Sequence, residues 1–310
     1  MVPVYNEEET LHELVQRMRQ VLEGLVSTWE VLFVDDGSRD RSWEIILQLA
    51  QEEPRIRGLR FSRNFGHQMA FFAGIEHAKG DAVVIMDGDL QDPPELIPEL
   101  LAKHRQGYEV VYAVRSARHG ETLFKKFTAK MFYRLFAKLT SLNLPLDTGD
   151  FRLMGKKAVE AFRRLPERHR FTRGLVTWLG FSQVGVTYER APRYAGTSKY
   201  PLRKMLRLAF DAITSFSHAP LQVATGLGFL VSAFAFVYIV VVLALKLAGG
   251  FRPGYTSLMA AMLFLGGVQL VMVGLLGEYV GRIYDEVKRR PLYLVAEETG
   301  GKEEREGVKR

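Results

Sequence analysis

The chain has 310 residues, 47% of them hydrophobic, with a formal net charge of +7 and no cysteine. This length accommodates one good-sized domain and an additional part, and the lack of cysteine excludes disulfides, iron–sulfur clusters and thiol catalysis. The basic residues cluster next to apolar segments, and the sequence lacks a zinc motif and an aromatic-interleaved basic groove. These features favour a phospholipid surface over nucleic acid as the partner.

Up to about residue 217 the sequence reads as a soluble α/β protein, in which short apolar runs alternate with helical patterns. Strands are expected at residues 1–4, 29–34, 56–61, 83–86, 109–113 and 184–189, and after the turn at 146–150. Helices are expected at residues 11–25, 42–52, 69–77 and 94–106. This alternation is typical of a doubly wound, mostly parallel sheet with helices on its faces.

The apolar run at 83–86 leads directly into Asp87-Gly88-Asp89. An uninterrupted apolar run predicts a strand buried on both faces, and ligands bind at the carboxyl ends of such strands. Two carboxylates separated by one small residue supply the hard oxygen donors that Mg²⁺ or Mn²⁺ prefers, with a phosphate group sharing the ion. The alternative is an acidic loop that caps the following helix, which begins at Pro93 and Pro94.

Two other expected strands also end in polar residues. Asp35-Asp36-Gly37-Ser38 follows the strand at 29–34, and Ser62-Arg63-Asn64 follows the strand at 56–61. Because parallel strands share one carboxyl edge, these loops are expected to meet the acidic pair and form a binding site. Asp35 and Asp36 could instead cap the next helix, Arg63 could be structural, and His67 could be an ordinary packing residue.

The second half of the domain changes character. Residues 122–141 predict an amphipathic helix with a basic and an aromatic face, which suits a membrane interface; the alternative is a surface helix packed on the sheet. Residues 163–173 are expected to form a basic loop, and Trp178 fits a core or interface position. The loop at 190–201 combines polar donors with anion-binding charge from Arg193 and Lys199.

Two long segments without charged residues, 219–245 and 253–277, follow a second amphipathic helix at 201–217. Each exceeds the roughly 30 Å hydrocarbon core at about 1.5 Å per residue, although a buried soluble hairpin passes the same test. Basic residues flank the pair on both outer sides, namely Arg203, Lys204, Arg207, Arg282, Lys288, Arg289 and Arg290. The positive-inside rule therefore places both flanks in the cytoplasm and the linker at 246–252 outside.

The first residues are acidic and polar and do not resemble a signal peptide. We therefore expect a protein of the inner membrane with two spans, whose catalytic domain and termini are cytoplasmic. The expected division is a catalytic domain at 1–200, a juxtamembrane helix at 201–217, a membrane domain at 218–284 and a charged tail at 285–310, disordered from Glu297 onward. A metal and phosphate site held at a membrane suits an enzyme that joins a soluble phosphate-bearing substrate to a lipid.

Six motifs, in order along the chain, carry a family resemblance: Val-Pro-Val-Tyr-Asn-Glu-Glu, Val-Asp-Asp-Gly-Ser, Ser-Arg-Asn-Phe-Gly, Asp-Gly-Asp-Leu-Gln-Asp-Pro-Pro, Gly-Asp-Phe-Arg-Leu-Met and Arg-Tyr-Ala-Gly-Thr-Ser-Lys-Tyr. With the two C-terminal spans, they resemble glycosyltransferase family 2. More closely, they resemble the polyprenyl-phosphate glycosyltransferases, which include dolichyl-phosphate mannose synthases and bacterial undecaprenyl-phosphate glucosyltransferases. One departure is that only Met1 and Val2 precede the first proline, so the first strand is truncated or begins upstream.

The resemblance implies a GT-A fold and an inverting transfer from a nucleotide-diphospho-sugar, with UDP-glucose the first expectation, to undecaprenyl phosphate. It implies nucleotide-sugar binding by Pro3, Tyr5, Asn6, Glu7, Asp35, Asp36 and Asp87. Asp87, Asp89 and Gln91 would surround Mg²⁺ or Mn²⁺. Asp150, with Asp89 and Gln91, would be catalytic, and Arg152, Arg193, Ser198 and Lys199 would bind the acceptor phosphate.

Two other functions compete with this interpretation. A processive polysaccharide synthase shares the fold, but those enzymes carry Q-x-x-R-W and further spans, and Q-x-x-R-W does not occur in this sequence. An inactive, membrane-anchored scaffold that binds nucleotide sugars is disfavoured by the intact acidic pair, Gln91 and Asp150. The sequence leaves open whether the protein forms a homo-oligomer.

Overall fold

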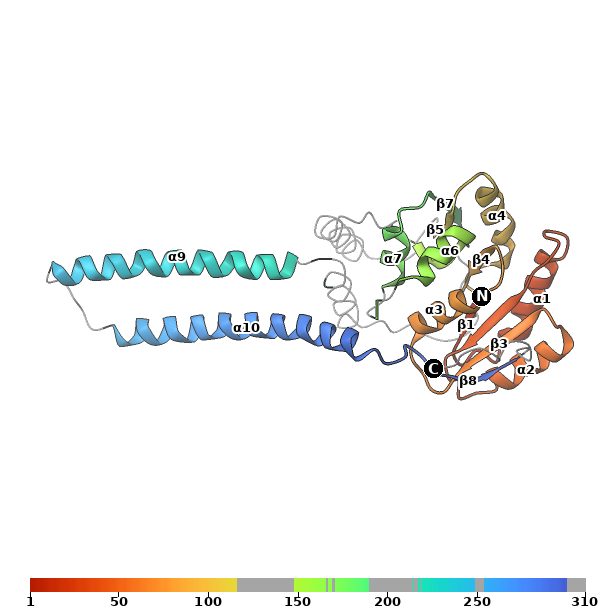
Figure 1. Ribbon diagram of the computed structural model, residues 1–310, viewed down its shortest axis with the longest axis horizontal. Helices are drawn as coiled ribbons and strands as arrows, with labels where there is room; N and C mark the ends of the chain where they lie inside the picture. The colour runs from red at the N-terminus through yellow and green to blue at the C-terminus, as the bar shows by residue number, and fades with distance from the viewer. Residues whose placement is uncertain are drawn as a thin grey trace.

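The computed structural model of the chain describes residues 1–115, 148–165, 167–168, 171–189, 214, 217, 219–248 and 254–299. In these residues an α/β domain is followed by two long helices that extend away from it side by side (Figure 1). The helices expected at 122–141 and 201–217 lie outside the described residues, apart from residues 214 and 217.

The strands of the domain form two four-stranded sheets. The first has the order β1 (Val2–Val4), β2 (Val31–Asp35), β3 (Ile56–Phe61) and β8 (Val295–Glu298). The second has the order β4 (Ala82–Ile85), β6 (Thr148–Gly155), β5 (Val110–Arg115) and β7 (Gln183–Tyr188). The α/β class is confirmed, but the sheet is mixed, because β6 runs antiparallel to β4 and β5, and β8 antiparallel to β3.

The two sheets meet where β1 lies beside β4. The amino group of Met1 donates to the carbonyl oxygen of Val84 at 2.7 Å, and the N–H of Met86 donates to the carbonyl oxygen of Met1 at 3.3 Å. The loops that follow β1 and β4 are therefore neighbours. The Thr10 hydroxyl joins them directly by donating to the carbonyl oxygen of Gly88 at 2.8 Å.

Helices cover the strands and close the core. Their bounds are α1 Leu11–Leu22, α2 Ser42–Glu52, α3 His67–His77, the 3₁₀ turn η1 Pro94–Leu96, α4 Ile97–Arg105, α6 Lys156–Arg163 and α7 Thr172–Trp178. In α1 the buried residues Leu11, Leu14, Val15 and Met18 recur at the spacing of one helical face. Burying such a side chain stabilises the fold by about 1.5–3 kcal/mol. The sequence analysis predicted neither α6 nor α7, and the first two residues of α7 fall in the expected basic loop.

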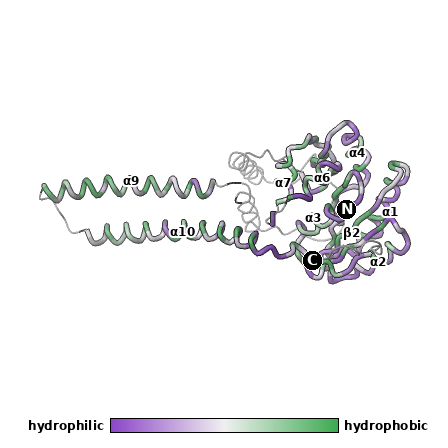
Figure 2. Tube along the Cα trace, in the orientation of Figure 1, coloured by the Kyte–Doolittle hydropathy of each residue, from purple (hydrophilic) through white to green (hydrophobic). Residues whose placement is uncertain are grey.

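The two long helices are α9 (Ala219–Leu247) and α10 (Tyr255–Lys288). Figure 2 shows that the residues of these helices are predominantly hydrophobic, whereas hydrophobic and hydrophilic residues are mixed along the trace of the domain. By length and composition, Pro220–Val242 and Phe264–Lys288 could each cross a membrane, and neither window is buried inside the protein. That exposure argues against the buried soluble hairpin.

The segment after α10 returns to the domain. Strand β8 pairs with the edge of β3, and the Tyr293 ring stacks on Phe61 with ring centroids 4.8 Å apart. Glu297 accepts from Arg60 Nη1 at 3.1 Å and from Trp43 Nε1 at 3.1 Å. The expectation of disorder from Glu297 onward is thus wrong for Glu297 and Glu298, because β3 offers an unpaired edge flanked by basic side chains; residues 300–310 lie outside the described residues.

Candidate active site

Hydrogen bonds tie the loop after β1 to the loop after β2. The N–H of Asn6 donates to Ser38 Oγ at 3.0 Å, and the N–H of Arg39 donates to Asn6 Oδ1 at 2.9 Å. The N–H of Glu7 donates to Ser42 Oγ at 2.9 Å. Asn6 has a φ of 57°, a left-handed conformation that asparagine tolerates better than most residues. The predicted nucleotide-binding residues of this loop are therefore held in place, and Tyr5 among them is exposed.

Asp35 and Asp36 are buried at the end of β2, and both accept hydrogen bonds from backbone N–H groups of loops. Asp36 accepts from the N–H groups of Phe65 at 2.7 Å and Gly66 at 3.0 Å, and Asp35 Oδ1 accepts from the N–H of Ser38 at 3.0 Å. Burial raises the pKa of both carboxyls, and these hydrogen bonds oppose the rise. The structure thus gives both residues a loop-holding role, while their contact with a nucleotide stays a prediction.

Gly37 lies at a close contact between the loop after β2 and the loop after β3. A Cβ at this position would come within 2.6 Å of the carbonyl carbon of Arg63, and its φ is +70°. Both the space and the backbone conformation therefore require glycine. The loops after β2, β3 and β4, which the sequence predicts to converge, approach one another beside the carboxyl ends of β1 and β4.

The Asp87-Gly88-Asp89 loop concentrates negative charge beside the β1 loop. Burial and then the nearby Asp89 carboxylate raise the pKa of Glu7 to about 7. Burial raises the pKa of Asp87 to about 6, although His67 opposes the rise. Burial and neighbouring carboxylates both disfavour the ionised form of these groups, and a bound cation would favour it.

The donor set fits a divalent cation that is shared with substrate. Gln91 is buried, and its Oε1 has no hydrogen-bond partner among the residues that the structure describes. Three or more His, Asp or Glu side chains do not gather into a metal cage anywhere in the described ranges. Asp87, Asp89 and Gln91 would leave coordination positions open, and Mg²⁺ characteristically takes one or two carboxylates together with substrate phosphates.

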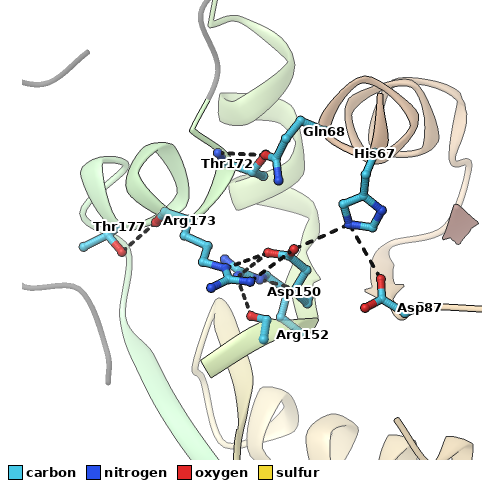
Figure 3. Close-up of polar contacts among 9 residues, drawn as sticks. His67, Gln68, Asp87, Asp150, Arg152, Thr172, Arg173 and Thr177 are labelled. Atoms are coloured by element: carbon cyan, nitrogen blue, oxygen red, sulfur yellow. Dashed lines mark hydrogen bonds and ion pairs between the residues drawn. The ribbon is translucent and has the colours of Figure 1, made fainter. Parts of the chain in front are cut away.

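Asp150, on β6, is the centre of a second charged group that faces the acidic loop (Figure 3). Arg173 Nε lies 2.9 Å from Asp150 Oδ1, and Arg152 Nη2 lies 3.6 Å from the same oxygen. His67 Nε2 lies between two carboxylates, 3.5 Å from Asp150 Oδ2 and 3.6 Å from Asp87 Oδ1. His67 therefore connects the acidic loop after β4 to the catalytic carboxylate predicted on β6.

The electrostatics keep Asp150 ionised. Burial by itself raises its pKa, but the hydrogen bond from His67 and the charge of Arg173 outweigh it and hold the pKa well below the usual range. An aspartate in this state does not donate a proton and is a weak base. It can orient a neighbouring cation or stabilise positive charge that develops next to it.

Arg152 is oriented inward. Its side chain is 5% exposed, and its guanidinium donates to the carbonyl oxygens of Gly149 at 3.0 Å and Asp150 at 3.3 Å. Burial lowers its pKa to about 10. Contact between Arg152 and an acceptor phosphate stays a prediction, and Arg193, Ser198 and Lys199 lie outside the described residues.

Sequence reasoning missed two residues of this group. His67 was interpreted as a packing residue, and Arg173 as part of a basic loop. The available signals were the position of His67 directly after Ser-Arg-Asn-Phe-Gly and that of Arg173 within Arg-Phe-Thr-Arg-Gly. A separate hollow, lined by Met1, Trp29 and Ala82 among others, opens where β2 and β4 begin. It lies at the opposite ends of the strands and does not belong to this site.

Known proteins share both halves of the chain. Residues 1–163 match Glycosyl transferase family 2, and residues 219–283 match the GtrB C-terminal hairpin. An uncharacterized glycosyltransferase of Bacillus subtilis (strain 168), YkcC, is 52% identical over 97% of this chain and 93% of that protein. A bactoprenol glucosyl transferase of Shigella phage SfII is 44% identical over 95% of this chain and 96% of that protein. Among solved structures, glucosyl-3-phosphoglycerate synthase from Mycobacterium tuberculosis has a TM-score of 0.44 at 21% identity, covering 70% of this chain and 78% of that one.

Proposed function

The chain belongs to glycosyltransferase family 2, and we propose that it transfers glucose from UDP-glucose to undecaprenyl phosphate, with inversion, to give a polyprenyl-phospho-sugar and UDP. The observation that carries the proposal is that Asp87 and Asp150 both lie close to His67 Nε2, at 3.6 and 3.5 Å. This arrangement sets an acidic, cation-binding loop across from a cationic group. The similarity to a bactoprenol glucosyl transferase over nearly the whole chain supports the choice of sugar and lipid.

The proposal includes a divalent cation, Mg²⁺ or Mn²⁺, held by Asp87, Asp89 and Gln91. The ion would neutralise the charge that develops on the departing diphosphate. The residues of the chain do the rest: the loops after β1 and β2 seat the nucleotide, and the Thr10 hydroxyl holds the acidic loop by donating to the carbonyl oxygen of Gly88 at 2.8 Å.

The acceptor needs no strong base. A phosphate monoester has a second pKa of about 6 and is already largely dianionic near neutral pH, so its oxygen can attack the anomeric carbon as the bond to the diphosphate breaks. Asp150, kept ionised by its neighbours, is placed to stabilise the positive charge that develops on the sugar.

We further propose that α9 and α10 cross the inner membrane, with the catalytic domain and both termini in the cytoplasm. The pairing of β8 with β3 supports this topology, because it keeps the segment after α10 on the same side as the catalytic domain. The basic residues Lys288, Arg289 and Arg290 agree with it by the positive-inside rule. Cleavage of the catalytic domain by an external protease in intact cells would contradict this topology.

The decisive assay incubates full-length protein in detergent with radiolabelled nucleotide sugars, undecaprenyl phosphate and Mg²⁺ or Mn²⁺. We expect label from UDP-glucose to enter the organic phase in a metal-dependent way, with a product mass that corresponds to one hexose on the lipid phosphate. Folded protein that transfers no label from any nucleotide sugar would overturn the proposal. Label from a different nucleotide sugar would keep the transferase and correct the donor.

A further inference from the structure

We infer that Arg173 binds the phosphate of the lipid acceptor, and that α7, which carries it, is the wall of the site next to the membrane. The inference rests on the proposed function and deepens it, because it names the residue and the helix that meet the lipid. Three observations support it: the charge around Asp150, the exposure of Arg173, and the place of α7 in the molecule.

The first observation is that two positively charged side chains lie beside Asp150. Asp150 contacts the guanidinium groups of Arg152 and Arg173, at 3.6 and 2.9 Å. Both guanidinium groups stay protonated. They lie beside the position where, in the proposed function, an acceptor oxygen approaches the sugar. A phosphate dianion complements their positive charge.

The second observation separates the two arginines. The Arg173 side chain is 38% exposed, whereas that of Arg152 is 5% exposed and donates to carbonyl oxygens of its own strand. Arg173 can therefore be reached from solvent, whereas the buried Arg152 cannot. Two nitrogens of Arg173 lie 2.9 and 3.4 Å from the Asp150 carboxylate. A phosphate bound to Arg173 would therefore lie close to that carboxylate.

The third observation concerns the direction from which the acceptor arrives. A polyprenyl chain stays in the bilayer, so its phosphate must enter from the membrane side. Helix α7 lies on the side of the domain that faces α9 and α10 (Figure 1). The N–H of Arg168, just before α7, donates to Glu286 Oε1 at the end of α10 at 2.7 Å, which fixes this region to the membrane hairpin.

Helix α7 also carries an exposed aromatic residue. Trp178 is 57% exposed, and its position five residues after Arg173 turns it to a different side of the helix from the residue that contacts Asp150. Tryptophan is enriched at membrane–water interfaces, where its ring is apolar and its N–H stays hydrated. The helix thus presents a phosphate-binding side chain to the site and an interfacial side chain to the bilayer.

The first experiment measures Arg173→Gln and Arg173→Lys in the full-length protein, with Lys157→Gln as the control. Lys157, on α6, is 78% exposed and lies outside the site, so its replacement removes one positive charge without touching the site. We expect Arg173→Gln to raise the KM for undecaprenyl phosphate by about tenfold to a hundredfold, the effect of losing a hydrogen bond to a charged group. The KM and the Kd for UDP-glucose should not change, and Arg173→Lys should retain part of the acceptor affinity.

These measurements separate binding from positioning. If Arg173 only orients Asp150, kcat falls while the KM for the lipid stays the same, and the inference is wrong. Unchanged binding of UDP-glucose shows that the variant is folded. If the wild-type protein itself transfers no sugar, the proposed function is wrong. If the wild type is active but Arg173→Gln leaves the KM for the acceptor unchanged, only the inference about Arg173 is wrong.

The second experiment tests the membrane contact without activity. The chain has three tryptophans, Trp29, Trp43 and Trp178. In nanodiscs whose lipids carry bromine near the headgroup, we expect quenching of the protein's fluorescence that is lost in Trp178→Phe and kept in Trp29→Phe. Equal quenching in wild type and Trp178→Phe would place α7 away from the bilayer and overturn that part of the inference.

Discussion

The two sides of the site are built from different interactions. On the side that we propose binds the donor, backbone groups dominate: Asp36 accepts from two N–H groups, and the loops after β1 and β2 exchange hydrogen bonds through Asn6 and Ser38. On the acceptor side, ion pairs between side chains of Asp150, Arg173 and His67 dominate. Backbone bonds fix the shape of a pocket before the ligand arrives, whereas side-chain pairs can exchange a partner for an incoming anion. We therefore expect the proposed donor pocket to be preformed and the proposed acceptor pocket to be adaptable.

The strongest test of this contrast removes a carboxylate that we propose binds the cation. We expect Asp89→Ala to lower divalent-dependent turnover by about 10²–10³-fold, because the developing charge on the diphosphate loses its counterion. Asp81→Ala, which changes an exposed aspartate paired with Lys156, is the control. Turnover that is undiminished in Asp89→Ala would remove Asp89 from the metal site.

The next test probes the acceptor side. Asp150→Asn keeps the shape of the side chain and removes its charge, so we expect kcat to fall by about 10²-fold while the Kd for UDP-glucose is unchanged. Steady-state kinetics and donor titration measure the two quantities. An equal loss of donor affinity would show that the two sides of the site are not separate.

The donor side should respond to mutation through stability. Asp36→Ala leaves the N–H groups of Phe65 and Gly66 without their acceptor, so we expect the free energy of unfolding to fall by about 1–3 kcal/mol and the Kd for UDP to rise. Thermal unfolding with and without UDP measures both effects. Arg173→Gln, examined in parallel, should lower the Tm by less, because the Arg173 side chain is 38% exposed and glutamine can still donate to Asp150. A larger drop in Tm for Arg173→Gln than for Asp36→Ala would contradict the contrast.

The smallest effect is expected at the C-terminal strand. Glu297→Gln removes the charge from the pair with Arg60 but leaves an oxygen for Trp43 Nε1. We expect a loss of less than about 1 kcal/mol, as for other exposed ion pairs. Glu44→Gln, on the exposed side of α2, is the matched control. A large drop in Tm for Glu297→Gln alone would show that β8 holds the domain together.

The sequence predicts those features that depend on local pattern. The buried run at 83–86 and the acids that follow it mark a strand and its carboxyl end, and parallel topology brings such ends together. The role of His67 could not be predicted, because it depends on the start of α3 lying close to both the loop after β4 and Asp150 of β6. Arg173 acts only because α7 packs beside Asp150, and no periodic pattern marks so short a helix.

The strand β8 fails as a prediction for a different reason. Its sequence, Val-Ala-Glu-Glu, is short and charged, and all four residues remain exposed. The strand is ordered by the edge of β3, more than two hundred residues earlier, where Arg57 and Arg60 pair with its two glutamates. Composition alone therefore indicates a disordered tail, whereas the partner edge supplies both the hydrogen bonds and the opposite charge.

The pairing of β8 also limits the distance between the end of α10 and the catalytic domain. Six residues, 289–294, separate the end of α10 from the start of β8, and such a segment spans at most about 25 Å. In the proposed topology this tether limits how far the catalytic domain can rise from the bilayer or turn about the axis of the hairpin. The chemistry is therefore kept within reach of a headgroup that cannot leave the membrane, and bilayers of different thickness would change how the catalytic domain sits on the lipid surface.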